Sequence, residues 1–349
     1  MNKEQASLGK NVDEEKSSLE NKGKPLSAPK TGEEKKGEIN IEDLPGVGAA
    51  TGEKLREAGF TNLMSLAVAS PGELVEVAGV GEAVARKIIN TARNKLDMGF
   101  ESGEDLLRRR QQVIKITTGS NAFNALLGGG VETGAVTEMY GAYGSGKTSL
   151  AHQLAVSVQL PKEKGGANGM AIWVDSEGTF RPEYIEKIAK ANGLDPKVAL
   201  KNFKTGRAFN TDHQMLMIEK IEELIQQGLP IKLVIVDSLM SHFRSEFLGR
   251  SQLADRQQKL NKHIHYLLKL AHTYNLAVYV TNQVMAKPDT FFGDPTEAVG
   301  GHIIAHASTY RCYLRRGKKG SRVAKLVDAP AMPDGECIFI VTDDGIKDV

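Results

Sequence analysis

Cysteines and long apolar runs are both scarce in this sequence, and each scarcity argues against a class of protein. Only Cys312 and Cys337 occur among the 349 residues, and neither belongs to a CxxC pair. This argues against a disulfide-stabilised fold and a zinc site, and it favours a reducing compartment. Apolar runs such as residues 233–236 fall far short of the roughly 18 residues that a membrane span requires. We therefore expect a cytoplasmic protein with no signal peptide and no membrane partner.

The sequence also lacks a strong charge of one sign, because its 45 Lys and Arg residues are nearly balanced by 43 Asp and Glu residues. The net charge is +2. Overall charge thus gives no indication of a nucleic-acid partner, which must be argued from local basic segments. With 40% hydrophobic and 25% charged residues, the composition is that of a folded globular protein. The length suggests about two domains, at roughly 150 residues per domain.

Changes in composition divide the chain into four segments. Residues 1–38 alternate Lys and Glu with small polar residues and precede the first aromatic residue, Phe60. They cannot bury enough apolar surface to compensate for the backbone entropy lost on folding, so we predict a disordered tail. Residues 39–97 carry apolar residues at helical spacing between glycines and prolines, which predicts a small all-α domain. A charged linker, residues 98–112, then leads to the larger unit, residues 113–349.

The larger unit is predicted to be an α/β domain with a mostly parallel central sheet. Short apolar runs alternate with helical patterns, as expected for strands joined by helical crossovers. Polar residues follow each of the runs, which are residues 136–140, 170–174, 233–236 and 277–280. Ligands of open α/β sheets bind beyond the carboxyl ends of the strands, so these polar residues predict one shared site. Beyond Ser308, short strands and turns predict antiparallel strands at one edge.

The segment GAYGSGKT has the pattern of a phosphate-binding loop in the context that such a loop requires. It follows a predicted strand and precedes a helical pattern over residues 149–160. Glycines allow backbone N–H groups to curl around phosphates, and the helix presents its positive N-terminus to them. The alternative is a glycine-rich surface turn with an exposed Lys. The predicted nucleotide-binding residues are Gly141, Ala142, Tyr143, Gly144, Ser145, Gly146, Lys147, Thr148 and Ser149.

Side chains at the other strand ends complete the predicted site. Asp237 is positioned like the acid that, together with the Thr148 hydroxyl, holds Mg²⁺ in P-loop enzymes. Glu177 lies just beyond a strand and is the candidate to accept a proton from the attacking water. Gln283, at another strand end, is the candidate sensor of the γ-phosphate. Each of these residues also has a structural alternative. Asp237 is alternatively a turn residue, and Glu177 an acid that stabilises a helix N-terminus. Gln283 is alternatively an amide that completes its hydrogen bonds at the edge of the core.

Two glycine turns near the N-terminus are candidates for contact with DNA. Residues 44–55 and 78–88 each place a Gly-x-Gly turn between helical patterns, which exposes backbone N–H groups to a DNA phosphate. The pair resembles a helix-hairpin-helix domain. A structural or protein-binding role is the alternative.

Two further candidates lie in the larger unit. The first spans the residues between Asp237 and a helix predicted at 257–270, where spaced arginines suit a mobile loop that follows a phosphate backbone. The second is the long irregular segment 284–301, which contains Lys287 and two phenylalanines that are able to stack on bases. Aromatic side chains that pack back onto the protein are an equally consistent explanation.

Several long segments in one order resemble archaeal RadA recombinases, which are relatives of bacterial RecA. Besides the helix-hairpin-helix start, these are GAYGSGKT, DSEGTFRPEYI, IVDSLMSHFRSEFLGR and VTNQVMAKPDTFFGDPTEAVGGHIIAH. The resemblance covers about residues 41–349 and implies a RecA-like ATPase core that binds ATP between adjacent subunits of a helical filament on single-stranded DNA. Such filaments pair with a homologous duplex and exchange strands in recombination and repair. The implied partners are single- and double-stranded DNA, further copies of the chain and recombination mediators. The implied location of the protein is the nucleoid.

The resemblance also implies roles for individual residues. Glu177 matches the catalytic carboxylate and Gln283 the γ-phosphate sensor, while His302, Asp328 and Pro333 match residues that act on the nucleotide of a neighbouring subunit. From the sequence alone, a structural role is the simpler explanation of His302. Besides ATP and Mg²⁺, K⁺ near Asp328 is a further candidate cofactor. The implied DNA contacts are Arg244, Arg250, Arg256, Lys287, Gly300 and Gly301.

Two positions depart from the family pattern. The Phe-x-x-Ala segment that joins protomers would begin at Phe100 and end at Gly103, which lacks a methyl group worth about 1 kcal/mol. We expect Phe100 to anchor nonetheless. Tyr184 stands where the family usually has an Arg stacked on adenine, so stacking is retained but the cation is absent.

The leading hypothesis is a DNA-dependent ATPase that forms recombination filaments. A ring helicase on the same core is one alternative, and Phe100 beside a linker favours open helical assembly over a ring. A non-catalytic regulator that uses ATP only as a switch is the other alternative. Glu177 argues against the regulator because such a protein has no need of a catalytic carboxylate.

Overall fold

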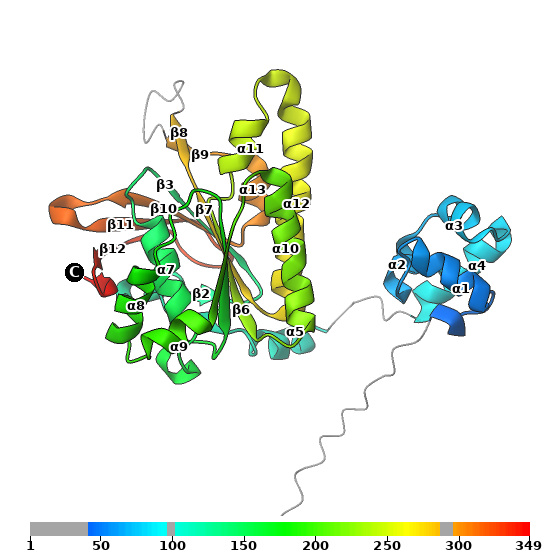
Figure 1. The fold of residues 1–349 in the computed structure, drawn as a ribbon, viewed down its shortest axis with the longest axis horizontal. Coiled ribbons are helices and arrows are strands. Elements are labelled where there is room, and N and C mark those ends of the chain that lie inside the picture. The colour runs from blue at the N-terminus through cyan, green and yellow to red at the C-terminus, as the bar shows by residue number, and fades with distance from the viewer. Residues whose placement is uncertain (1–40, 96–101, 287–295) are drawn as a thin grey trace, which may run out of the picture. The chain divides into compact units, whose positions relative to one another are not determined.

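The chain folds into two units, each with a core of its own. The computed structural model describes residues 41–95, 102–286 and 296–349. The first unit ends at Glu101 and the second begins at Ser102. Figure 1 shows the helices of the first unit and the sheet and helices of the second. The predicted tail, residues 1–38, and the linker residues up to 101 lie outside the described residues.

The N-terminal unit consists of short helices, as its composition predicts. Asn62 and Ser70 begin two of them with reciprocal capping boxes. The helix that Ser70 begins ends at Gly79, whose φ of 67° lies in the left-handed region that glycine adopts without strain. Apolar faces meet in a core around Leu55 and Leu74. The elements are η1 (Ile41–Asp43), α1 (Ala49–Glu57), α2 (Leu63–Val68), α3 (Pro71–Ala78) and α4 (Glu82–Lys95).

The C-terminal unit is built on a nine-stranded sheet with the order β13-β12-β11-β10-β3-β7-β6-β4-β5. From β10 to β5 neighbouring strands run parallel, and β11, β12 and β13 continue the sheet antiparallel at one edge. The strands are β3 (Val136–Gly141), β4 (Met170–Asp175), β5 (Phe203–Arg207), β6 (Ile231–Asp237), β7 (Ala277–Asn282), β10 (Tyr310–Arg316), β11 (Arg322–Asp328), β12 (Gly335–Thr342) and β13 (Gly345–Asp348).

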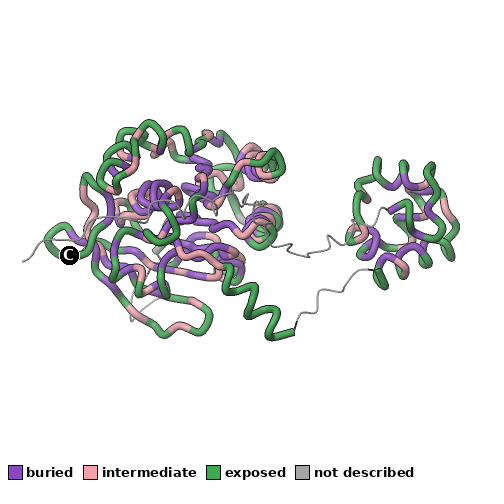
Figure 2. Tube along the Cα trace, turned by 90° about the horizontal axis from the view of Figure 1, so that it is seen from below, coloured by how far each residue is buried: buried purple, intermediate pink, exposed green. Residues whose placement is uncertain are grey.

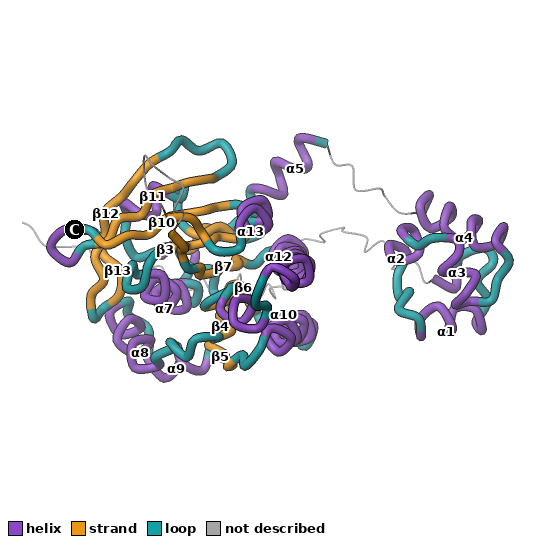
Figure 3. Tube along the Cα trace, turned by 90° about the horizontal axis from the view of Figure 1, so that it is seen from above, coloured by secondary structure: helices purple, strands orange, loops and turns teal. Residues whose placement is uncertain are grey.

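Helices cover both faces of this sheet (Figures 1 and 3). Alternate strand residues therefore serve two cores: Trp173 and Ile235 belong to one, and Val174 and Val236 to the other. Burial on both faces explains why β4, β6 and β7 contain continuous apolar runs. Figure 2 shows that the buried residues gather in the interior of this unit. One face carries α7 (Lys147–Ser157), α8 (Pro182–Ala191) and α9 (Pro196–Lys201), and the other carries α10 (Thr211–Gln226), α12 (Leu253–Tyr274) and α13 (Gly301–Ala307).

Shorter elements join these layers. The strand β8 (Val284–Ala286) pairs antiparallel with β9 (Thr296–Ala298), and we call this pair the β8–β9 stem. The remaining elements are α5 (Gly103–Arg110), β1 (Lys115–Ile116), α6 (Asn121–Leu126), β2 (Val131–Glu132), η2 (Lys162–Lys164), α11 (Ser241–Glu246), η3 (Arg250–Gln252) and η4 (Lys318–Gly320).

The predicted linker, residues 98–112, contains the helix α5. Ser102 begins this helix, because its hydroxyl oxygen accepts a hydrogen bond from the backbone N–H of Asp105 at 3.1 Å. At the other end, Arg110 Nη2 lies 2.9 Å from Oε1 of the buried Glu132. The last turn of α5 is therefore attached to the C-terminal unit.

The predicted fold class is confirmed, with a mostly parallel sheet, helices on both faces and antiparallel strands at one edge. Within the described residues, no helix combines the length and the apolar composition needed to cross a membrane. Several features differ from the prediction. The segment 284–301 was predicted to be irregular, but its described residues include both strands of the β8–β9 stem. The strand β10 lies beyond Ser308, where antiparallel strands were predicted, but it pairs parallel with β3. The edge strand β5 was not predicted. The first arginine-rich segment was predicted to be irregular, and this was wrong, because it contains α11 and the first turns of α12.

Both cysteines are buried free thiols in the antiparallel part of the sheet. Cys312 lies in β10 and Cys337 in β12, with β11 between the two strands. Burial raises the pKa of both thiols, that of Cys337 to about 11. Neither thiol is therefore ionised to a useful extent at neutral pH.

Candidate nucleotide-binding site

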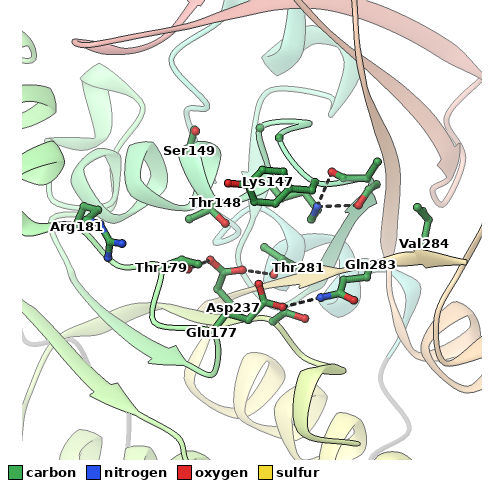
Figure 4. A pocket seen from close by; sticks show the side chains of 16 residues that line it. Lys147, Thr148, Ser149, Glu177, Thr179, Arg181, Asp237, Thr281, Gln283 and Val284 are labelled. Atoms are coloured by element: carbon green, nitrogen blue, oxygen red, sulfur yellow. Dashed lines mark hydrogen bonds between the residues drawn. The ribbon is translucent and has the colours of Figure 1, made fainter. Parts of the chain in front are cut away.

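A cavity of about 660 Å³ lies beyond the carboxyl ends of β3, β4, β6 and β7. At least one polar residue from beyond each of the four predicted strands lines this cavity, as the sequence led us to expect. Figure 4 shows side chains from these separate segments converging on the cavity. Its lining residues are Gly141, Ala142, Tyr143, Gly144, Gly146, Lys147, Thr148, Ser149, Glu177, Thr179, Arg181, Asp237, Ser238, Thr281, Gln283 and Val284.

The glycine-rich loop joins β3 to α7. Gly144 and Gly146 have φ of 74° and 104°, a backbone conformation in which residues with a side chain are strained. Gly146 is the N-cap of α7, so the first turn of the helix, with Lys147 and Thr148, faces the cavity. Most of α7 is buried. A helix N-terminus fixed in this way is suited to bind an anion through its free N–H groups.

Lys147 points into the cavity from the first turn of α7 (Figure 4). Its Nζ donates hydrogen bonds to the carbonyl oxygens of Gly141 at 2.7 Å and Ala142 at 3.1 Å. Burial lowers the pKa of Lys147, while the nearby carboxylates of Asp237 and Glu177 oppose this shift. A partly buried ammonium in this place is further stabilised by any ligand that brings phosphate charge.

Asp237 ends β6, and its carboxylate is surrounded by hydroxyl groups. Thr281 donates to Oδ1, and Thr179 donates to Oδ2 at 3.1 Å. Burial raises the pKa of Asp237, and hydrogen bonds from the hydroxyls of Thr281, Thr148 and Thr179 act in the opposite direction. Asp237 and Thr148 thus bring a carboxylate and a hydroxyl oxygen to the same part of the cavity.

This set of donors fits Mg²⁺ bound together with a phosphate ligand. Mg²⁺ prefers oxygen ligands and is usually held by one or two protein groups, substrate phosphates and water. Within the described ranges, no group of three or more His, Cys, Asp or Glu side chains is arranged to hold a metal. Two buried hydroxyls at or near the cavity, Ser145 Oγ and Ser238 Oγ, have no hydrogen-bond partner. Such groups are expected where ligand oxygens or water complete a site.

Asp175 shapes the segment that carries Glu177. Its Oδ1 accepts hydrogen bonds from the backbone N–H groups of Glu177 at 3.1 Å, Gly178 at 2.6 Å and Thr179 at 3.2 Å. Its Oδ2 accepts from the N–H of Phe180 at 3.3 Å. Several bonds to one carboxylate fold this segment back over the end of β4, which brings Glu177 to the cavity.

Glu177, Gln283 and Arg244 form a continuous chain of hydrogen bonds. Gln283 Nε2 donates to Glu177 Oε1 at 2.8 Å, and Arg244 Nη1 donates to Gln283 Oε1 at 2.9 Å. Glu177 and Gln283 line the cavity, whereas Arg244 lies on α11. The chain therefore leads from the cavity to the arginine-rich segment predicted to contact DNA.

Some lining residues were missed at the sequence level. Thr179, Arg181, Ser238 and Thr281 line the cavity but were not predicted as site residues. A usable signal existed for Ser238 and Thr281, because both lie next to residues already predicted at the carboxyl ends of strands.

Four residues predicted to contact nucleotide lie away from this cavity. Tyr184 packs beside His152, with ring centroids 5.3 Å apart, and its hydroxyl donates to the Thr342 carbonyl at 2.8 Å. Asp328 and Pro333 are exposed at and beyond the end of β11. His302 lies in α13 and lines a separate cavity of about 300 Å³.

The predicted DNA-contacting residues are spread over several elements. Arg256 lies in the first turns of α12, and Gly300 and Gly301 begin α13. Lys287 and Phe100 fall outside the described residues, as does the side chain of Arg250. Gly103 is the first residue of α5, where an added Cβ would have no other atom within 4 Å.

Comparison with known families identifies the chain. Residues 109–349 match the family model described as Rad51. The chain belongs to the Rad51 family. Residues 39–94 match the model described as SAM-like helix-hairpin-helix tandem, in agreement with the predicted glycine turns. The protein is therefore a Rad51-family recombinase, a DNA-dependent ATPase that binds ATP, assembles filaments on single-stranded DNA and exchanges strands.

Proposed function

We propose that the cavity binds ATP together with Mg²⁺. We also propose that this chain belongs to the archaeal RadA branch of the family. Lys147 and the backbone N–H groups of residues 141–149 bind the phosphates. Thr148 and Asp237 hold the metal through oxygen atoms. Mg²⁺, when bound, neutralises charge on the phosphate oxygens. The orientation of α7 and the oxygen donors beside it support this assignment.

Glu177 accepts the proton of the attacking water, and Gln283 senses the γ-phosphate. Asp175 fixes the backbone on which Glu177 is carried, so the carboxylate stays at the cavity. Gln283 has an amide that donates and accepts at the same time, and it uses both functions here. A phosphate that engages this amide must compete with Glu177 or Arg244.

The observation that carries the proposal is the continuous chain Glu177–Gln283–Arg244. It supports a mechanism in which occupancy of the nucleotide cavity changes the orientation of Arg244. Arg244 then contacts DNA together with the other family-matched positions. These are Arg250, Arg256, Lys287, Gly300 and Gly301. If the wild-type protein bound single-stranded DNA equally tightly with and without ATP, this function would be refuted.

Arg244→Ala is expected to weaken ATP-dependent binding to single-stranded DNA. If Arg244 neutralises one phosphate, the slope of log affinity against log salt falls by about 0.7 in magnitude. The measurement is fluorescence anisotropy with a labelled oligonucleotide over a salt series. Lys220→Ala is the control, since Lys220 is an exposed cation on α10 paired with Glu223. An unchanged slope for Arg244→Ala contradicts the assigned contact.

Contacts between subunits complete the proposed site. Phe100 and Gly103 belong to the segment that joins protomers, and His302, Asp328 and Pro333 act on the neighbour's nucleotide. K⁺ near Asp328 is part of this proposal. Tyr184 contributes an aromatic ring toward adenine after it gives up its hydrogen bond to Thr342. The exposed positions of Asp328 and Pro333 support an action on another subunit.

Gly103→Ala is expected to strengthen self-assembly. The added methyl group restores an apolar contact of about 1 kcal/mol, which corresponds to roughly fivefold tighter association. Light scattering against protein concentration, without DNA, measures this change. Gly72→Ala is the control, because Gly72 also lies in the first turn of a helix with free space around an added Cβ. Equal effects of the two substitutions would mean that helix propensity alone is responsible.

Strand exchange with matched and mismatched duplexes, with and without ATP, tests the complete function. The protein is expected to exchange strands with the matched duplex only, and only with ATP. Electron microscopy of the same mixtures separates an open filament from a closed ring. A six-membered ring that translocates without pairing would favour the helicase alternative.

A further inference from the structure

Asn282 is the last residue of β7 and lies directly before Gln283. Its side chain is fully buried, and Nδ2 donates to Glu138 Oε1 at 2.8 Å and to the Val299 carbonyl at 2.6 Å. Its Oδ1 accepts from the backbone N–H of Gln283 at 2.8 Å. Because both amide hydrogens and the oxygen are engaged, the side chain is held in one orientation.

These bonds close the base of the β8–β9 stem. The stem starts at Val284 and its second strand ends at Ala298, so Gln283 and Val299 flank it. Val299 N–H donates to the Gln283 carbonyl at 3.0 Å, while the Val299 carbonyl accepts from Asn282. The backbone of Gln283 is thus fixed on both sides, by Asn282 at its N–H and by Val299 at its carbonyl.

A buried carboxylate anchors this arrangement in the sheet. Glu138, in the neighbouring strand β3, is fully buried, and its Oε2 accepts a hydrogen bond from Arg311 Nε at 2.7 Å. The Arg311 guanidinium also lies over the Tyr140 ring, 5.5 Å from its centroid. A buried charge is costly unless it is paired and hydrogen-bonded, so both partners of Glu138 are strongly favoured to stay in place.

We propose that Glu138 and Asn282 are positioning residues that hold Gln283 between Glu177 and Arg244 and fix the β8–β9 stem to the sheet. Neither residue lines the nucleotide cavity, so both act through Gln283 and Val299. This inference rests on the proposed role of Gln283 as the γ-phosphate sensor. It adds a connection through the core of the sheet, which fixes the position of Gln283 relative to the β8–β9 stem.

The test measures coupling, defined as the ratio of single-stranded DNA affinity with ATP to that without ATP. Asn282→Asp sets a second carboxylate against Glu138 and removes the donor to Val299. We expect coupling to fall about tenfold, the factor that about 1.4 kcal/mol represents. ATP affinity measured without DNA is expected to stay at the wild-type level. Glu138→Gln keeps an oxygen that accepts from Asn282, so its loss of coupling is expected to be smaller.

The double variant Glu138→Gln, Asn282→Asp separates positioning from stability. The new amide at position 138 donates to the new carboxylate at position 282, so the melting temperature is expected to recover toward that of wild type. Coupling is expected to stay low, because the Val299 carbonyl still lacks its donor. A double variant that recovers coupling together with its melting temperature would overturn the proposal.

Two further variants serve as controls in the same assay. Thr137→Val removes a buried hydroxyl without a hydrogen-bond partner from the residue before Glu138, and it is expected to keep wild-type coupling. If Thr137→Val lost as much coupling as Asn282→Asp, the effect would be general to the core and the proposal would be wrong.

Gln283→Ala separates the sensor role of Gln283 from the positioning role of Glu138 and Asn282. Wild-type coupling in Gln283→Ala refutes the sensor itself, whereas loss there with none in Asn282→Asp refutes only the positioning role.

Discussion

A Lys147→Ala protein is expected to lose ATP binding by at least about a hundredfold, because charge-assisted hydrogen bonds to two phosphates are worth about 1.5 to 3 kcal/mol each. The ammonium already lies at the mouth of the loop, so it needs little rearrangement to bind phosphate. Isothermal titration with ATP and Mg²⁺ measures the loss. ATP-dependent DNA binding and filament formation are expected to disappear with it.

The fold itself should tolerate this substitution. Burial lowers the pKa of Lys147, which means that without a ligand the charged form is less favoured in this site than in water. The melting temperature without nucleotide is therefore expected to stay near that of wild type. Lys164→Ala, on the short helix η2, is the control for removal of a lysine elsewhere. An ATP-induced rise in melting temperature of wild-type size in Lys147→Ala would contradict the assigned contact.

Glu177→Gln is expected to bind ATP normally but to hydrolyse it about 10² to 10⁴ times more slowly, the usual contribution of a general base. The amide has nearly the shape of the carboxylate, so its oxygen is still able to accept from Gln283 Nε2. It cannot accept a proton from water. Single-turnover phosphate release gives the rate, and a fluorescent ATP analogue gives the affinity.

Filaments of Glu177→Gln on single-stranded DNA are expected to persist longer than those of wild type, since ATP stays intact. Glu183→Gln is a suitable control, because Glu183 is an acidic residue in the first turn of α8 and does not line the cavity. Normal turnover by Glu177→Gln would transfer the role of proton acceptor to another group. Slow turnover in both variants would point to a general effect on the chain.

The central strands were predictable because they are buried on both faces. The predicted runs at β4, β6 and β7 are continuous and apolar, whereas the run at β3 is interrupted by the buried polar residues Thr137 and Glu138. Each structural strand extends the predicted run by one or a few residues. The strand β5 reads FKTGR, in which only Phe203 is buried, so its pattern carries little signal. In α11, Phe243 is buried and stacks on Phe247 four residues later, but the arginines and serines around them obscured this helical spacing.

The site was predictable to the extent that it depends on strand ends. Parallel strands bring their carboxyl ends to one edge, which is why residues as distant as Thr148 and Gln283 were placed in one site. Which side chains bond to one another was not predictable. The contact between Arg244 and Gln283 depends on the direction of α11, and the one between Asn282 and Glu138 on the register of β7 against β3. No local pattern in the sequence encodes either.

The two cysteines give this protein a natural probe of how its sheet opens. Cys312 and Cys337 are buried on strands separated by one other strand, and their raised pKa values suppress the reactive thiolate. A thiol reagent therefore modifies them only when this edge of the sheet separates, so labelling rates report the free energy of local opening. A single cysteine introduced at an exposed position can carry a fluorescent dye without prior removal of the native pair.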